Sequence, residues 1–436
     1  FRRWRSLHRE IFGEAFLREQ SNAMYWEKIH EVPDARIWDI RNHYRRSLMK
    51  YVRQRISADM TRRQESPGLI VNTIEALNEN ALTIGFARRF ATYKRAHLLF
   101  TNLNRLSELV NDPHRPVQFL FAGKAHPADK AGQDLIKHIV EVSRMPQFVG
   151  KVVFIENYDI ELAKKLIQGV DVWLNTPTRP LEASGTSGEK AVMNGVVNFS
   201  VLDGWWAEGF REDAGWAIKE ERTYENQDFQ NQLDAETIYN TFEEQIIPLF
   251  YDRTSKGLPE RWVNFVKNTI SGIAPHFTMK RMLDDYIRKY YLPQFDRASH
   301  MRSNHYDPAR RYADWKARML NAWNGIEVAS MLMPDSTVRP LELGEGFRAE
   351  LVLIPGEVEA EHIGVEVIFG RKNDAGEVDE IIYRQELRMK EQEDGSLSYF
   401  CNFPVTQVGV FDYAFRIFPK HPDMPHRMDF PLVRWV

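Results

Sequence analysis

The sequence predicts an α/β fold built around a parallel sheet, followed by a smaller all-β domain. Three observations support this prediction. Between about residues 81 and 204, apolar strand-like segments alternate with helical segments, at the spacing of a parallel sheet with right-handed crossovers. Before that region apolar residues recur at helical spacing. After about residue 335, short β-branched and aromatic segments alternate with Gly, Asp and Asn turns, which is typical of a β-sandwich.

Length and composition limit the class of protein. The 436 residues suffice for two to three domains, and the net charge of −3 gives no electrostatic case for nucleic acid or for an acidic membrane surface. The single cysteine, Cys401, excludes an intrachain disulfide and a Cys-based zinc site. No apolar run approaches the roughly 18 residues of a membrane span, and the first ten residues lack the apolar core of a signal peptide. We therefore expect a cytoplasmic protein. Since the chain does not begin with Met, we also expect it to be part of a longer one.

The first 65 residues are predicted to be helical. Large apolar residues lie at helical spacing along this segment, and Pro33 followed by Asp34 marks a helix start. These apolar residues are Ile37, Trp38, Ile40, Leu48, Tyr51, Val52 and Ile56.

Five strands and the helices between them follow. The predicted strands are ALTIGFA (81–87), VQFLFAGKA (117–125), KVVFIENY (151–158), VDVWLN (170–175) and VVNFSVLDG (196–204). The predicted helices run from Tyr93 through Leu109, over 127–144 and over 160–169. Residues 205–296 are predicted to be helices and loops, and residues 314–325 form a late helix. The β-sandwich strands are predicted at 348–355, 364–371, 381–389, 398–405 and 410–419.

Four cations stand where the first predicted strand joins its helix. They are Arg88, Arg89, Lys94 and Arg95, of which we expect Arg95 to face solvent. Ligands of open α/β sheets bind at the carboxyl ends of strands, and cations placed there favour an anion such as phosphate.

A loop of small residues, 183–188, follows the fourth predicted strand, and Lys190 comes just after it. Small residues let backbone N–H groups approach an anion closely, and a following helix N-terminus adds partial positive charge. A lysine at this point can reach a phosphate or form a Schiff base. The alternative is a Gly/Ser-rich surface turn with a solvated lysine.

Two motifs, RRFATYKRA (88–96) and RPLEASGTSGEK (179–190), resemble those of the α-glucan phosphorylases, the family of glycogen, starch and maltodextrin phosphorylases. The similarity is strongest to the short bacterial and archaeal branch. In that family the matching lysine, here Lys190, binds pyridoxal 5′-phosphate covalently. The branch usually has Met before this lysine, where the present chain has Glu189. We have no account of this difference.

The resemblance implies a reaction and the residues that perform it. The reaction is reversible phosphorolysis of α-1,4-glucan to α-glucose 1-phosphate with retention, in which inorganic phosphate and the glucan are the partners. The implied catalytic residues are Lys190, Arg89 and Lys94. The implied cofactor contacts are Lys190, Arg88, Tyr158, Thr186, Ser187 and Gly188. The implied substrate contacts are Glu182, Ser184, Gly185, Arg89 and Lys94. No metal is expected, and a homo-oligomer is left open.

The resemblance also implies a two-lobed glycosyltransferase architecture of the GT-B type. It assigns residues 1–66 to the helical end of a truncated N-terminal lobe and residues 67–296 to a Rossmann-like lobe that carries the cofactor. Residues 297–326 are then a crossover helix region, and residues 327–436 are the β-sandwich. Because most of the N-terminal lobe is missing, we expect this chain to bind the cofactor without full turnover.

Two alternatives stay open. Nucleotide-sugar glucosyltransferases such as glycogen synthase share the architecture and carry two glutamates separated by seven residues. Glu182 matches the first, but Lys190 occupies the second position and Glu189 falls one residue short. The other alternative is a non-catalytic remnant that binds carbohydrate.

Overall fold

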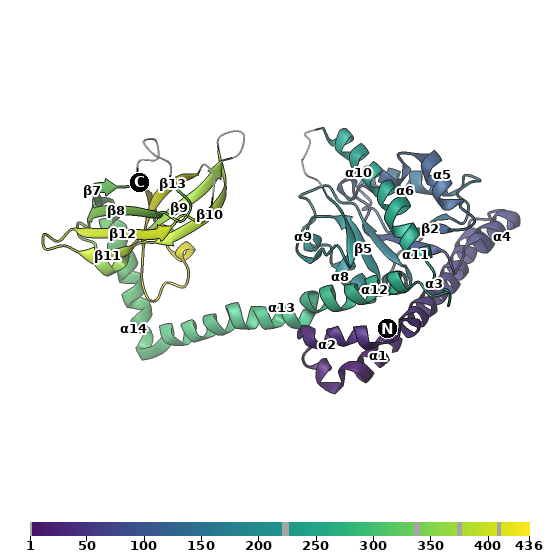
Figure 1. The fold of residues 1–436 in the computed structure, drawn as a ribbon, viewed down its shortest axis with the longest axis horizontal. Helices are drawn as coiled ribbons and strands as arrows, with labels where there is room; N and C mark the ends of the chain where they lie inside the picture. The colour runs from purple at the N-terminus through teal and green to yellow at the C-terminus, as the bar shows by residue number, and fades with distance from the viewer. Residues whose placement is uncertain (1, 220–225, 335–340, 373–376, 408–410) are drawn as a thin grey trace. The chain divides into compact units, whose positions relative to one another are not determined.

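The computed structural model describes residues 2–219, 226–334, 341–372, 377–407 and 411–436. The chain divides into two compact units, Phe1–Tyr286 and Ile287–Val436 (Figure 1). Within the described residues, no helix combines the length and apolarity needed to span a membrane.

Helices open the first unit. They are α1 (Arg2–Phe12), α2 (Ala23–Glu27), α3 (Asp34–Arg62) and α4 (Pro67–Ala76). The long helix α3 begins at Asp34, directly after Pro33, as the sequence predicts. Its buried residues include Ile37, Ile40 and Leu48, so the periodic apolar residues do face the core.

Six parallel strands form the central sheet. They are β1 (Leu82–Ala87), β2 (Val117–Ala122), β3 (Val152–Ile155), β4 (Val172–Asn175), β5 (Val197–Val201) and β6 (Gly215–Ile218). Their order is β3-β2-β1-β4-β5-β6, so the direction of the strand order reverses between β1 and β4. The α/β prediction and its first five strands are confirmed. The prediction of only helices and loops over 205–296 is wrong at β6, a Gly-Trp-Ala-Ile segment that lies between charged residues and contains no β-branched residue before its last position.

The sheet is covered on both faces. In β1, Leu82, Ile84 and Phe86 pack into one core together with residues of α5 (Leu103–Val110), α6 (Lys130–Ser143), α10 (Gln227–Thr241), α11 (Ile247–Tyr251) and α12 (Glu260–Asn268). In β2, Leu120 and Ala122 pack into a second core with α3 and α7 (Ile160–Gly169). Burial on both faces explains why these strands read as continuous apolar runs.

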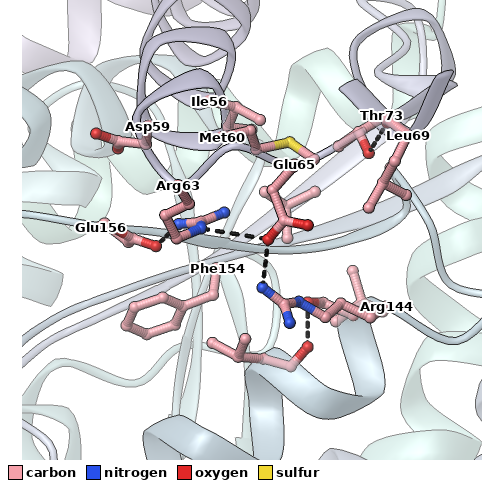
Figure 2. A pocket seen from close by; sticks show the side chains of 15 residues that line it. Ile56, Asp59, Met60, Arg63, Glu65, Leu69, Thr73, Arg144, Phe154 and Glu156 are labelled. Carbon is pink, nitrogen blue, oxygen red and sulfur yellow. Dashed lines mark hydrogen bonds and ion pairs between the residues drawn. The ribbon is translucent and has the colours of Figure 1, made fainter. Parts of the chain in front are cut away.

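A small pocket of about 60 Å³ lies beside the C-terminal part of α3 (Figure 2). Residues of α4, α6 and β3 complete its wall. Glu65 forms an ion pair with Arg144 at 2.6 Å, and Arg63 forms an ion pair with Glu156. None of the residues that line this pocket is a predicted site residue.

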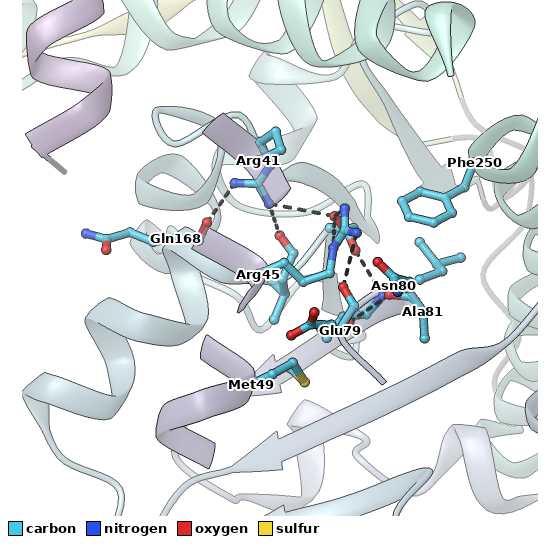
Figure 3. A network of polar contacts seen from close by, with 12 residues as sticks. Arg41, Arg45, Met49, Glu79, Asn80, Ala81, Gln168 and Phe250 are labelled. Atoms are coloured by element: carbon cyan, nitrogen blue, oxygen red, sulfur yellow. Dashed lines mark hydrogen bonds and ion pairs between the residues drawn. The ribbon is translucent and has the colours of Figure 1, made fainter. Parts of the chain in front are cut away.

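A buried polar network ties α3 to the start of β4 (Figure 3). Arg41 donates to the carbonyl oxygens of Gln168 at 2.7 Å and Asn194 at 3.0 Å. Arg45 pairs with Asp171 at 2.9 Å, and the other carboxylate oxygen of Asp171 accepts from the N–H of Thr83 in β1 at 3.1 Å. Burial lowers the pKa of Arg41 to about 10, and the nearby Asp171 opposes this shift. The network therefore fixes α3 against the two strands that flank the reversal point.

The remaining helices include α14, which is longer than the late helix predicted from the sequence. Helices α8 (Thr186–Val192) and α9 (Trp205–Gly209) follow β4 and β5, and α13 (Met279–Tyr286) ends the first unit. The helix predicted over 314–325 is the end of a longer one, α14 (Leu292–Ala322), which continues as a 3-10 turn to Gly325. Its residues Ser303–Tyr306 are non-helical, so α14 is kinked within the segment 297–326, for which a crossover helix region is expected.

Two antiparallel four-stranded sheets make up most of the second unit. One has the order β10-β9-β13-β14 and the other β11-β12-β8-β7. The strands are β7 (Glu327–Leu332), β8 (Gly346–Ile354), β9 (Ile363–Lys372), β10 (Val378–Glu386), β11 (Arg388–Glu391), β12 (Leu397–Pro404), β13 (Asp412–Pro419) and β14 (Arg434–Trp435). Residues of both sheets and of α14 share one core, so the predicted β-sandwich is confirmed. Val410, the predicted start of the last long strand, lies outside the described residues.

Candidate functional site

All predicted site residues except Tyr158 lie in the two segments that follow β1 and β4, where the strand order reverses. Arg88 and Arg89 come directly after β1, and the segment 176–190 comes directly after β4. These two strands are neighbours, paired at Ile84–Val172 and Gly85–Trp173. In open α/β sheets the crevice at such a reversal is where ligands bind, because the loops after the two strands diverge there.

An ion cluster of three buried side chains lies at this edge. The carboxylate oxygen Oε2 of Glu182 accepts from Nζ of Lys94 at 2.5 Å and from Nη2 of Arg88 at 2.9 Å. The exposed fractions of these side chains are 5% for Glu182, 9% for Lys94 and 10% for Arg88. Burial lowers the pKa of Arg88, while Glu182 raises it. Arg89 is exposed, and in the part of the chain that is described its guanidinium makes no hydrogen bond or ion pair.

The guanidinium of Arg88 still has free donors. Its Nε and Nη1 atoms are buried and have no hydrogen-bond partner among the described residues. A buried donor without a partner costs about 1–3 kcal/mol, so an anion that binds these two atoms is favoured. The free edge of Arg88 thus fits a phosphate group.

The expectation that Arg95 faces solvent is wrong. Arg95 is 2% exposed and pairs with Asp234 at 2.6 Å. It also donates to the carbonyl oxygens of Thr176 at 3.0 Å and Pro177 at 2.8 Å. Its backbone is left-handed, with φ of 47°, and this interrupts the helix predicted from Tyr93, which forms instead as two 3-10 turns and α5. Arg95 therefore fixes the segment after β4 against the segment after β1.

The small-residue loop is held against α9. The carbonyl oxygen of Ser184 accepts from the N–H of Trp205 at 2.8 Å. Gly185, which precedes α8, has φ of 89°, a conformation that favours glycine. A Cβ atom on Gly188 would stand 2.8 Å from the indole of Trp205 and 2.9 Å from Asn198. These two glycines permit the tight approach of the loop to Trp205.

The hydroxyl-bearing residues of the loop differ in surroundings. Ser187 accepts from the indole N–H of Trp173 at 3.2 Å, whereas Thr186, the first residue of α8, is exposed. Trp205 and Trp206 are both buried in a core with Val192, so they pack against the protein.

Lys190 is exposed on α8, as the fifth residue of that helix. Its neighbour Glu189 is half-buried. Burial raises the pKa of Glu189, while Lys190, a hydrogen bond with Ser184 and the charge of Arg281 lower it. The pKa of Glu189 is thus influenced by residues of the loop and of α13.

Tyr158 stands apart from the ion cluster. It follows β3, which β2 separates from β1, and it packs half-buried against the core under α3 and α7. Burial raises the pKa of its hydroxyl. Among the described residues, no hydrogen bond joins it to Arg88, Lys94 or Glu182.

Sequence reasoning missed Asp203. Its carboxylate accepts from the backbone N–H of Glu182 at 2.9 Å and of Gly204 at 2.8 Å. It therefore ties the loop after β4 to the loop after β5. The Asp-Gly pair at 203–204 is a turn signal that the sequence offered.

A second pocket, of about 450 Å³, is lined by the end of α9, by Arg211 and by residues between Gly272 and Arg281. Phe277 lines it, and its ring packs edge-on against Trp205 at 5.0 Å between centroids. Arg211 and Arg281 also line it, and each is paired with an aspartate, Asp213 and Asp285. The pocket contains none of the predicted site residues.

Comparisons with known proteins identify related chains. Residues 39–269 match the family model described as carbohydrate phosphorylase, and residues 323–436 match that of the glycogen phosphorylase C-terminal domain. The chain is 36% identical to the maltodextrin phosphorylase of Thermococcus litoralis over 94% of its length and 47% of the relative. It is 43% identical to the glycogen phosphorylase of Aquifex aeolicus, over 66% of its length and 41% of the relative. It is 35% identical to the glycogen phosphorylase of Mycobacterium tuberculosis, over 96% of its length and 48% of the relative.

The chain spans about half the length of the curated relatives it matches. The carbohydrate phosphorylase model alone matches more than half of the present chain, and it includes β1, β4 and the loops that follow them. The chain therefore belongs to the carbohydrate phosphorylase family.

Proposed function

We propose that the complete protein is an α-glucan phosphorylase, which cleaves α-1,4-glucan with inorganic phosphate to give α-glucose 1-phosphate with retention. The observation that carries the proposal is the ion cluster of Arg88, Lys94 and Glu182 beside the glycine loop of Lys190. Buried cations next to a loop of small residues, at the reversal point of a parallel sheet, suit a reaction in which phosphate is both bound and transferred.

Pyridoxal 5′-phosphate is the proposed cofactor. Lys190 holds it, and Arg88 binds its phosphate through the free Nε and Nη1 atoms. The backbone N–H groups of Thr186 and Ser187, at the start of α8, lack intrahelical partners and point to the same role. Tyr158 is proposed to contact the ring, and Gly188 to leave room for it. When bound, the cofactor supplies a phosphate whose second pKa near 6 suits proton exchange with the substrate phosphate near neutral pH.

The substrates are assigned to the remaining side chains. Arg89 and Lys94 hold the substrate phosphate, and their charge stabilises the ions that separate as the glycosidic bond breaks. Glu182, Ser184 and Gly185 contact hydroxyls of the terminal glucose. Glu182 connects the residues assigned to the glucose hydroxyls with those assigned to the substrate phosphate, because its carboxylate contacts Lys94.

Phosphorolysis assays on two polypeptides test the proposal. The complete protein, incubated with maltoheptaose and phosphate, is expected to release glucose 1-phosphate, and residues 1–436 alone are expected to bind the cofactor without full turnover. Glucosyl transfer from a nucleotide sugar without phosphate would favour the glycogen-synthase-like alternative. Robust phosphorolysis by residues 1–436 would overturn the second expectation, and inactivity of both polypeptides would favour a remnant.

A further inference from the structure

One carboxylate oxygen serves two cations in the ion cluster. Oε2 of Glu182 accepts from both Lys94, at 2.5 Å, and Arg88, at 2.9 Å. All three side chains are at least nine-tenths buried, so water screens these contacts little. A carboxylate, like phosphate, offers anionic oxygen atoms that accept charge-assisted hydrogen bonds from Arg and Lys. Glu182 therefore occupies a place where a bound anion is favoured.

The side chains of Arg88 and Lys94 differ in which donors are still available to bind an anion. Arg88 keeps Nε and Nη1 free, so an anion can bind there while Glu182 stays on Nη2. For Lys94, the one acceptor among the described residues is Glu182, and its ammonium otherwise lies 4.5 Å over the ring of Tyr93. An anion that binds Lys94 has to share it with the carboxylate or displace the carboxylate.

Backbone hydrogen bonds fix the main chain around Glu182, while its carboxylate is bonded, among the described residues, to Arg88 and Lys94. The N–H of Glu182 is bonded to Asp203, and the next loop residues are bonded to Trp205 through Ser184. Separation of the carboxylate from Lys94 therefore requires a rotation of the Glu182 side chain, but it does not require these backbone hydrogen bonds to break.

Resting on the function proposed above, we propose that Glu182 competes with substrate phosphate for Lys94. Phosphate binds when the carboxylate leaves Lys94, and the released carboxylate is then free to accept a hydroxyl of the glucan. The cofactor phosphate, at the free edge of Arg88, does not meet this competition. Phosphate and glucan binding thus favour each other, although they bind different atoms.

The test measures the dissociation constant for inorganic phosphate by isothermal titration calorimetry on the chain incubated with the cofactor and on three variants treated in the same way. Glu182→Gln removes the charge, and Glu182→Asp keeps the charge but shortens the reach to Lys94. Each is expected to bind phosphate about ten-fold more tightly, or better, than the wild type, since charge-assisted contacts of this kind are worth that much. The control Glu108→Gln removes a charge from an exposed position on α5 and is expected to leave the constant within about two-fold of the wild type.

The two Glu182 variants distinguish direct competition for Lys94 from repulsion of phosphate by the negative charge of Glu182 alone. Tighter binding in Glu182→Gln together with unchanged binding in Glu182→Asp would overturn the proposal, because the charge alone would then explain the gain. Weaker binding in either variant would overturn it as well. If the variants fail to fold, a crystal structure of the wild type with phosphate decides. A Lys94–Glu182 contact broken by phosphate supports the competition, and a contact still at 2.5 Å beside bound phosphate contradicts it.

These outcomes are independent of the cofactor assignment. The competition depends only on Arg88, Lys94 and Glu182, whereas cofactor binding is read from modification of Lys190. A chain that takes no cofactor but gains phosphate affinity on Glu182→Asp would contradict the proposed function and keep the competition. A chain that binds the cofactor but shows no gain in phosphate affinity in Glu182→Asp would support the proposed function and contradict the competition.

Discussion

Arg45 and Asp171 form an ion pair at 2.9 Å in which the two side chains are 1% and 0% exposed. The pair joins α3 to the first residue before β4, and through Asp171 to Thr83 of β1. It thus lies at the amino ends of the strands whose carboxyl ends carry the candidate site. The position of the site residues depends on contacts at the opposite edge of the sheet.

Asp171→Asn is expected to destabilise the first unit by about 3–5 kcal/mol, because it leaves the guanidinium of Arg45 buried without a counter-charge. Urea denaturation followed by tryptophan fluorescence measures the effect. The control Asp39→Asn breaks an exposed pair with Arg3 at 3.0 Å and is expected to cost no more than about 1 kcal/mol. Equal losses in the two variants would show that the buried network does not hold α3.

Gly188→Ala is expected to cost about 1–3 kcal/mol, since the new Cβ atom meets Trp205 and Asn198 at less than 3.0 Å. It should also weaken retention of pyridoxal phosphate, measured by the absorbance that stays with the protein after gel filtration. Gly68→Ala, on α4 with nothing within 4 Å, is the matched control and should not destabilise the chain. A Gly188→Ala protein as stable as Gly68→Ala would contradict the close packing of the loop on Trp205.

Protonation of Glu366, in β9, is expected to make the second unit less stable in acid. Burial alone would raise the pKa of Glu366, but hydrogen bonds from Arg427 and Arg416 hold it below its usual 4.5. A depressed pKa in the folded state means that the stabilisation is present above about pH 4.5 and is lost as the pH falls through the folded-state pKa.

Hydrogen exchange of β9 peptides, corrected for the intrinsic rate at each pH, checks this prediction. Protection in the wild type should fall as the pH drops below 4.5. In Glu366→Gln the protection should be lower at neutral pH and its dependence on acid weaker. The exposed Glu357→Gln should behave as the wild type. A steep acid dependence that persists in Glu366→Gln would assign the effect to another carboxyl group.

Arg89→Gln is expected to separate function from stability. Because Arg89 is exposed and unpaired among the described residues, the free energy of unfolding should change by no more than about 0.5 kcal/mol. In the complete protein the KM for phosphate should rise about ten-fold or more, through loss of a charge-assisted contact. Arg318→Gln, on an exposed position of α14, should change neither quantity. An unaltered KM in Arg89→Gln would remove Arg89 from the substrate site.

Much of the fold could be predicted because its strands are buried on both faces. The first five strands of the sheet are continuous apolar runs, so composition alone marks them. The strand β6 has four residues, Gly215–Ile218, and is defined by its pairing with β5 more than by its sequence. Pairing of this kind is a tertiary property that local patterns do not contain.

The candidate site could be predicted in its location but not in its contacts. Residues that follow β1 and β4 were expected at one edge of the sheet, and the structure brings Arg88, Lys94 and Glu182 together there. Local sequence does not distinguish Arg95 from its neighbours, because its partner Asp234 is distant in the chain. Charge alone does not tell a buried arginine from a solvated one.

The central claim is that Lys190 carries pyridoxal phosphate, and borohydride reduction followed by peptide mass mapping tests it most directly. After incubation with the cofactor, the account predicts a pyridoxyl phosphate adduct on the peptide that contains Lys190. The peptide with Lys137, an exposed lysine of α6, serves as the internal reference and should stay unmodified. An unmodified Lys190 in excess cofactor, or equal labelling of both lysines, would contradict the account.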